Sequence, residues 1–279
     1  MQHKLYAGEG VYRLVDAARL AATRYANSLE RRSALIPLTL NRQIGAIAVA
    51  WAGVFLLASV PKLLFPATPL HGPADMLAIG LPYLLIAFAP IAGYGIAAGS
   101  FPGGVLTAQP GVRLAVYGKW RRLSVLEARK QPAYGPAGFM ASMLVGLLLN
   151  VVLRSFEFLL AVPALGNHAP DWGQALFHLM AADVVVMSFF YMVCFVMALR
   201  NVPYFPRMLL FTWTLDIAIQ MIIARQLGGM AELPLSVADS LNSLLHGNIT
   251  KVMISAFVWL PYLILSDRVN VTYRLRLRD

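Results

Sequence analysis

Cysteine is almost missing from this sequence, since Cys194 is the only one among 279 residues. A single thiol cannot form a disulfide within the chain, so the fold is not a cysteine-stapled scaffold. Cys194 also lies inside a long apolar stretch. Cysteine usage therefore does not indicate the compartment in which the protein works.

Charged residues are scarce as well, and acidic residues are the scarcest. Asp, Glu, Lys and Arg make up 13% of the chain, whereas hydrophobic residues make up 59%. Soluble domains have about 25% charged and 45–50% apolar residues, so the composition predicts a membrane protein. The formal net charge of +10 fits such a protein, because basic residues accumulate beside anionic lipid headgroups. We therefore expect an anionic bilayer as partner and no nucleic acid.

Enzyme motifs are also missing. The sequence contains no HExxH zinc motif, no GxSxG nucleophile motif and no Walker phosphate loop. Its five histidines are scattered over loops and apolar stretches. The sequence thus predicts no catalytic residue, no metal site and no cofactor, and it favours a protein that is not an enzyme.

Long apolar stretches, by contrast, are abundant. Six of them are close to the roughly 17–25 residues that a helix needs to cross a bilayer. They are residues 44–64, 76–98, 137–162, 175–199, 208–225 and 252–265. The last is short, and polar residues on either side are expected to extend it into the interfaces. The expected fold class is an all-α polytopic integral membrane helical bundle with six transmembrane helices.

Lys and Arg are divided unevenly among the segments that connect these spans. Nineteen fall in segments 1–42, 99–136, 200–207 and 268–279, whereas the loops on the other side hold only Lys62, with Arg225 and Lys251 at the span boundaries. Because cytoplasmic loops carry the excess of Lys and Arg, both termini are expected in the cytoplasm.

This pattern divides the chain into four parts. Residues 1–42 form a cytoplasmic basic amphipathic segment, 43–98 a two-helix transmembrane hairpin, 99–136 a basic cytoplasmic loop and 137–279 a four-helix transmembrane domain. In the first part, apolar residues recur at three- and four-residue steps between arginines. That spacing is typical of a helix in the headgroup region, or of one packed on the protein or a partner. Residues 111–130 are expected to form a short surface helix.

Three short motifs mark the C-terminal half. They are FPR at 205–207, VWLPY at 258–262 and SDRV at 266–269 followed by TY at 272–273. Over residues 138–273 the chain resembles the DUF2569 family, bacterial four-helix membrane proteins of unassigned function. The resemblance implies a four-helix fold in a bacterial inner membrane and lends no catalytic residues.

The end of the last span has the composition of a membrane anchor. Trp259 and Tyr262 flank Pro261, and Arg268 lies just beyond the apolar stretch. Aromatic and basic residues gather at membrane interfaces, and a cation there can also reach the last carbonyls of the helix. We predict that Trp259, Tyr262 and Arg268 anchor this helix, with a ligand site as the alternative.

Six polar side chains form a predicted intramembrane polar cluster in the outer half of the spans. They are Arg154, Glu157, His178, Asp183, Asp216 and Gln220. Arg154 lies eight residues before the end of its span and Asp183 eight residues after the start of the next, so both lie at one depth. The same reasoning pairs Glu157 with His178, and such pairs offset the cost of burying charge. Asp216 has no basic residue near it on its own helix and is expected to be unpaired.

Two interpretations of this cluster remain open. In the first, its members neutralise one another and fix the packing of a non-catalytic accessory or scaffold subunit of a larger inner-membrane assembly. Small residues at 45, 46, 50 and 53 would then face a membrane protein partner. In the second, the cluster lines a wet cavity of a small transporter or of a proton- or ion-coupled carrier. An enzyme acting on lipid-linked substrates through Glu157, His178 and Asp183 is a third hypothesis.

Overall fold

The computed structural model describes residues 33–105, 107–112, 118–230 and 232–279. Its elements, in chain order, are α2 (Leu35–Leu64), α3 (Pro73–Ser100), β1 (Trp120–Arg122), α4 (Val125–Lys130), α5 (Phe139–Ala161), α6 (Asp171–Leu199), α7 (Phe205–Gly228), α8 (Leu235–Leu265), α9 (Asp267–Arg274) and β2 (Arg276–Arg278). Six of these helices are long and apolar enough to span a membrane: α2, α3, α5, α6, α7 and α8. The all-α polytopic bundle is confirmed, and the protein is a multi-pass membrane protein.

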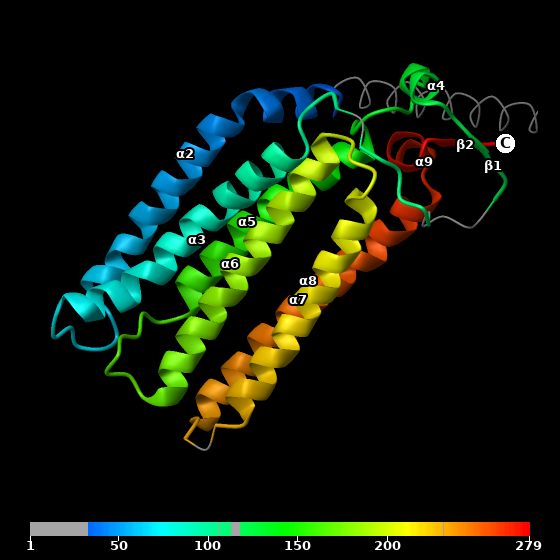
Figure 1. Cartoon of the computed structure of the whole chain (residues 1–279). Helices are drawn as coiled ribbons and strands as arrows, with labels where there is room; N and C mark the ends of the chain where they lie inside the picture. The colour runs from blue at the N-terminus through cyan, green and yellow to red at the C-terminus, as the bar shows by residue number, and fades with distance from the viewer. Residues whose placement is uncertain (1–32, 106, 113–117, 231) are drawn as a thin grey trace, which may run out of the picture.

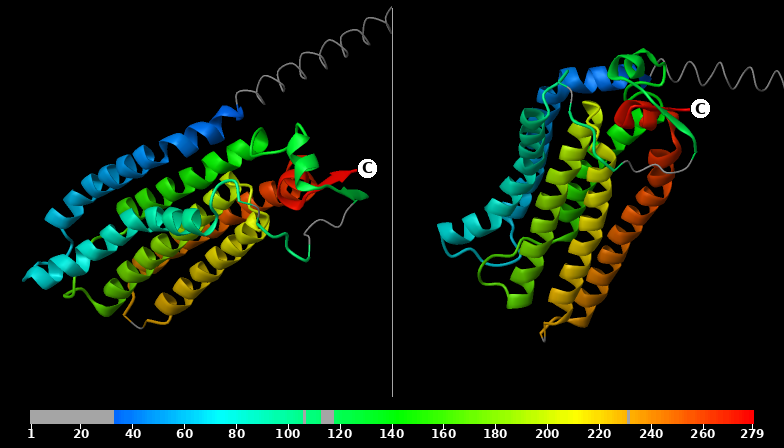
Figure 2. Two further views of the ribbon diagram at one scale, coloured as in Figure 1. Left: turned by 45° about the horizontal axis from the view of Figure 1, so that its top comes forward. Right: turned by 45° about the vertical axis from the view of Figure 1, so that its right-hand side comes forward.

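Helix α6 lies at the centre of the bundle and contacts α3, α5 and α7 (Figures 1 and 2). Its sequence is apolar on all sides, which is the pattern of a helix surrounded by other helices. Helix α2 packs on α3 at one side of the bundle, and α8 packs on α7 at the other. Few residues of α2 and α8 are buried, so these two helices turn most of their apolar side chains outward.

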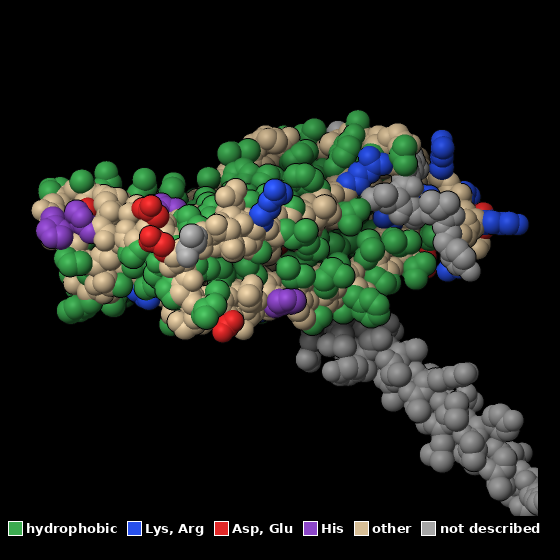
Figure 3. Space-filling model, turned by 90° about the horizontal axis from the view of Figure 1, so that it is seen from below, with side chains coloured by type: hydrophobic (Ala, Val, Ile, Leu, Met, Phe, Trp, Pro, Cys, Tyr) green, Lys and Arg blue, Asp and Glu red, His purple; other side chains and the backbone are tan. Residues whose placement is uncertain are grey.

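The outer surface of the bundle is strongly apolar. Large exposed side chains include Val49, Leu57 and Phe257, which are 73–83% accessible. Figure 3 shows hydrophobic side chains over most of one face, with Lys and Arg gathered toward one end. An apolar surface this large indicates contact with lipid or with other membrane proteins.

The basic end of the bundle consists of α4, β1, α9 and β2 (Figure 1). The two strands pair antiparallel, with Trp120 opposite Arg278. Helix α9 is tied to the bundle by Tyr273, whose hydroxyl donates to the carbonyl of Ala198 at 2.8 Å. Burial, together with the charge of Arg276, lowers the pKa of Arg274 to about 10. The C-terminal end of the chain thus folds back onto the segment between α3 and α5.

Three predictions about element boundaries are wrong. Helix α8 begins at Leu235, not at residue 252, because Leu241 and Leu245 pack into the bundle although polar residues surround them. Helix α2 begins at Leu35, inside the segment expected to precede the first span. The rest of the amphipathic segment predicted at 1–42, namely residues 1–32, lies outside the described residues.

The third error concerns the surface helix predicted at 111–130. Within the described part of this segment, Trp120–Arg122 is a strand and only Val125–Lys130 is helical. Ser124 begins this helix with a capping box: its hydroxyl accepts from the backbone N–H of Glu127, and the Glu127 carboxylate accepts from the N–H of Ser124. These bonds lower the pKa of Glu127. The capping residues therefore set the start of this helix. The basic composition of the segment does not indicate where a helix begins.

Candidate functional site

Four helices of the bundle contribute to a buried polar network, here called the Arg154 network. Its members are Arg154 on α5, Asp183 and Tyr191 on α6, Asp216 and Gln220 on α7, and Asn248 on α8. Asp216 and Gln220 are four residues apart and so share one face of α7. All members except Asn248 are buried, so the network lies inside the bundle and not on its lipid-facing surface.

Arg154 is bound to two carboxylates. Its Nη2 lies 2.6 Å from Oδ1 of Asp216, and its Nη1 lies 3.4 Å from Oδ1 of Asp183. The pair with Asp183, predicted from equal depth, is confirmed. The prediction that Asp216 is unpaired is wrong, because a guanidinium presents several donors and can bind carboxylates from two different helices.

Neutral side chains complete the hydrogen bonding of the two carboxylates. The hydroxyl of Tyr191 donates to Oδ2 of Asp216 at 2.9 Å, so both oxygens of Asp216 accept a hydrogen bond. The amide of Gln220 donates to Oδ1 of Asp183 at 3.0 Å, and the amide of Asn248 donates to Gln220 at 3.3 Å. Tyr191 and Asn248 were missed in the sequence. The sequence gives little indication of Tyr191, since a tyrosine two helical turns from Asp183 also fits an apolar core position.

The predicted pair of Glu157 with His178 is wrong. Glu157 forms an ion pair with Lys251, whose Nζ lies 2.5 Å from Oε1. His178 is exposed, and its Nδ1 is hydrogen-bonded to the carbonyl of Gln174 one turn earlier. Equal depth fixes the level of a residue in the membrane but not the direction in which its helix turns it.

This arrangement also separates the residues of the hypothetical acid–base set. Glu157 binds Lys251, Asp183 binds Arg154, and His178 binds a backbone carbonyl. Because each of the three residues has a different partner, these contacts do not support one substrate position shared by Glu157, His178 and Asp183.

A small cavity borders the network. It has a volume of about 80 Å³, and its polar lining comes from α5, α6, α7 and α8. The polar residues in this lining are Asn150, Arg154, Glu157, Tyr191, Asp216, Asn248, Lys251 and Ser255. A water molecule occupies about 30 Å³ of liquid, so the space is sufficient for very few waters or for one polar group.

A larger cavity of about 240 Å³ adjoins this one, because Asn150, Tyr191, Lys251 and Ser255 line both. The rest of its lining is mainly apolar and includes the rings of Trp213 and Trp259. The two cavities together form a groove with one polar and one apolar end, here called the α5–α8 groove.

The residues predicted to anchor the last helix contact protein. The ring of Trp259 stacks on that of Phe139 at 4.5 Å, and the ring of Tyr262 meets Phe139 edge-on at 4.9 Å. Arg268 donates to the carbonyl of Gly135 at 3.3 Å. These contacts join the end of α8 to the start of α5, while contact with lipid headgroups remains a prediction.

Comparison with known protein families, with curated proteins and with solved structures finds no match to this chain. The resemblance of the C-terminal half to the DUF2569 family therefore remains a prediction.

Proposed function

We propose that this protein is a small proton-coupled carrier of a bacterial inner membrane, with the Arg154 network as its proton-binding site. One observation carries the proposal: a single buried guanidinium binds two buried carboxylates beside a polar cavity. The uneven distribution of Lys and Arg supports a cytoplasmic position for the basic end.

The charge balance of the network supports proton binding. Two ionised carboxylates and one guanidinium carry a net charge of −1, and Gln220, Tyr191 and Asn248 are neutral amide and hydroxyl donors. A net charge inside the bilayer costs at least about 2.5 kcal/mol on the mildest scale. Taking up one proton removes this cost, so the network is suited to bind and release a proton.

Hydrogen bonding favours Asp183 as the residue that holds this proton. Both oxygens of Asp216 accept bonds, from Arg154 and Tyr191, which suits an ionised carboxylate. The two bonds to Asp183 both reach Oδ1. Its Oδ2 is therefore the oxygen on which a proton fits best.

The α5–α8 groove suggests the class of substrate. Lys251 is 58% exposed at the polar end, and tryptophan rings line the apolar end. A small amphipathic anion matches this arrangement, because its charge would lie near Lys251 and its apolar part along the rings.

Infrared difference spectroscopy on the purified full-length protein tests the proton site. We expect a band from a protonated buried carboxylic acid near neutral pH, and we expect Asp183→Asn to remove it. Asp171→Asn is the matched control, since Asp171 lies at the exposed start of the same helix. Absence of the band in the wild type, or an unchanged band in Asp183→Asn, overturns the proposal.

A second variant keeps this test decisive if Asp183→Asn fails to fold. Gln220→Met removes the amide that donates to Asp183 and leaves both carboxylates in place. The band should shift in this variant, and an unchanged band position would count against Asp183 as the proton site.

Tryptophan quenching tests the groove. A brominated medium-chain fatty acid, used as an anionic amphipathic probe, should quench part of the tryptophan fluorescence in a saturable way. Lys251→Met should weaken this binding about tenfold or more, whereas Lys62→Met, at the end of α2, should not. Equal binding in both variants would contradict the proposed substrate class.

The accessory-subunit hypothesis has an observation of its own and remains the second candidate. Gly45, Ala46, Ala50 and Gly53 are all exposed on α2, and a Cβ added at Gly45 or Gly53 would meet nothing within 4 Å. Small residues on an outward face allow close approach of another helix. Purification from native membranes in mild detergent should then yield a stoichiometric partner that Gly53→Leu releases. Isolation as a monomer would reject this candidate.

A further inference from the structure

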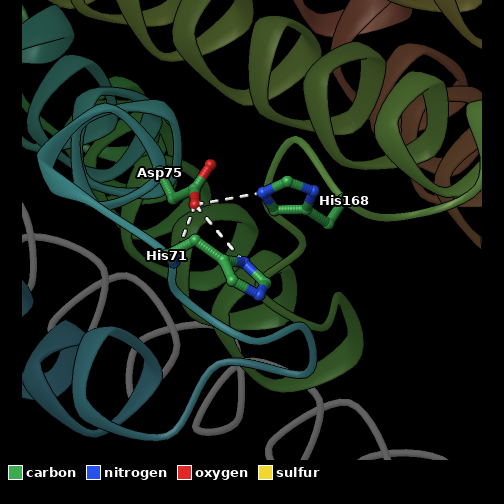
Figure 4. A group of neighbouring side chains, drawn as sticks. All are labelled: His71, Asp75 and His168. Atoms are coloured by element: carbon green, nitrogen blue, oxygen red, sulfur yellow. Dashed lines mark hydrogen bonds and ion pairs between the residues drawn. The ribbon is translucent and has the colours of Figure 1, made fainter.

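The end of the bundle opposite the basic end holds a cluster that the function proposed above does not use. The loop between α2 and α3 carries His71, the first turn of α3 carries Asp75, and the loop between α5 and α6 carries His168 (Figure 4). Their ligand atoms all lie within 4.8 Å of one another. We propose that His71, Asp75 and His168 form a binding site for a divalent transition-metal ion, with Zn²⁺ the best fit.

The two loops are held together independently of these three side chains. The backbone N–H of Ala67 donates to the carbonyl of Ala164 at 2.9 Å, and the N–H of Gly166 donates to the hydroxyl of Thr68 at 2.8 Å. Lys62 adds a bond to the carbonyl of Val162 at 3.2 Å. Residues almost a hundred positions apart are thereby fixed side by side, so the cluster does not depend on a chance approach of free loops.

Asp75 is the rigid ligand of the site. Its side chain is only 7% exposed. Its Oδ1 accepts from the amide of Asn167 at 3.1 Å, and its Oδ2 accepts from the backbone N–H of His71 at 2.9 Å. Hydrogen bonds of this kind orient metal-binding carboxylates in known sites.

The two imidazoles are close to the positions that a metal requires. Nε2 of His168 lies 3.4 Å from Oδ2 of Asp75, and Nδ1 of His71 lies 4.0 Å from it. Zinc bonds of about 2.0–2.1 Å in a tetrahedron place neighbouring ligand atoms roughly 3.4 Å apart. Both histidine side chains are more than half exposed, so a small rotation of His71 is sufficient to close the site.

The donor set selects the metal. Two imidazole nitrogens and one carboxylate oxygen suit Zn²⁺ and related transition metals, whereas Ca²⁺ and Mg²⁺ prefer oxygen ligands. Three protein ligands leave a fourth tetrahedral position for water or another ligand. Bound zinc would join the two loops at this end of the bundle.

An alternative is that the histidines only hydrogen-bond to Asp75 and hold the loops without a metal. The rings of His71 and His168 are in edge-to-face contact at 4.4 Å between centroids. Such a cluster would not bind zinc, which separates it from the proposed site.

Zinc binding to the full-length protein tests the proposal. The protein is purified in detergent with a tag that contains no histidine, incubated with Zn²⁺ and desalted, and its zinc content is measured. We expect one zinc per chain in the wild type and none in His71→Ala or His168→Ala. His178→Ala and His246→Ala are matched controls, because both histidines are exposed elsewhere on the bundle, and they should retain the metal.

Two further measurements sharpen the result. Asn167→Ala should weaken zinc affinity about tenfold or more, since it removes a bond to the ligand Asp75. Co²⁺ in place of Zn²⁺ should give the visible absorption of a tetrahedral site in the wild type and in the two control variants, but not in His71→Ala or His168→Ala. The proposal is overturned if the wild type binds no zinc, or if its zinc content is unchanged in both His71→Ala and His168→Ala.

Discussion

At the scale of single residues, Arg154 compensates the negative charge of two carboxylates that are buried inside the bundle. Its guanidinium is the cation nearest to both Asp183 and Asp216 in the network. Breaking a buried ion pair by removing one partner leaves an uncompensated charge, which is far more costly than removing the whole pair.

We therefore predict that Arg154→Met lowers the free energy of unfolding by about 3–5 kcal/mol. Adding Asp183→Asn and Asp216→Asn to it should recover more than half of this loss, because the remaining groups are neutral. Thermal unfolding in detergent measures both effects. If the triple variant is no more stable than Arg154→Met alone, the network is not held by charge compensation.

At the scale of elements, the contact between α3 and α6 depends on a glycine. A Cβ added at Gly93 would lie 2.6 Å from the carbonyl oxygen of Phe189, so the two helix backbones touch at this point. No side chain can be accommodated there unless the helices move apart.

Gly93→Ala should accordingly destabilise the bundle by about 1–3 kcal/mol, the usual cost of overpacking. Gly95 lies on the same helix, and a Cβ there would meet nothing within 4 Å. Gly95→Ala should be neutral or slightly stabilising, since alanine favours the helix more than glycine does. Denaturation of the two variants in the same detergent makes the comparison, and equal stabilities would refute the close contact.

At the scale of the whole molecule, the two ends of the bundle are closed in different ways. The basic end is closed by pairing of the C-terminal strand β2 with β1, supported by a bond from the N–H of Asp279 to the carbonyl of Lys119. The opposite end is closed by the bonds between the loops that carry His71 and His168.

Deleting residues 276–279 should loosen the basic end and leave the six long helices in place. The side chains of Arg121 and Arg122 are already exposed. The deletion removes β2, so the backbone of β1 loses its partner strand and becomes free to enter the active site of a protease. We expect faster cleavage by trypsin at Lys119, Arg121 and Arg122, with unchanged helical content by circular dichroism. Unchanged cleavage would mean that β1 is held without β2.

The sequence by itself determined the class of the protein. Apolar runs long enough to cross a bilayer leave few alternatives to a helical membrane bundle, because a backbone inside lipid must satisfy its own hydrogen bonds. Depth along the helices also placed Arg154 beside Asp183 correctly. These properties depend on composition and on position along the chain, and both can be read from a linear sequence.

Only the tertiary structure decided which side chains meet. Helix rotation turned His178 outward and brought Asp216 to Arg154, and the early start of α8 set Lys251 beside Glu157. The same applies to His71 and His168, which looked scattered because they are 97 positions apart, yet lie in loops that are hydrogen-bonded to each other. Rotation and loop contacts result from packing among all the helices at once, so no single stretch of sequence contains them.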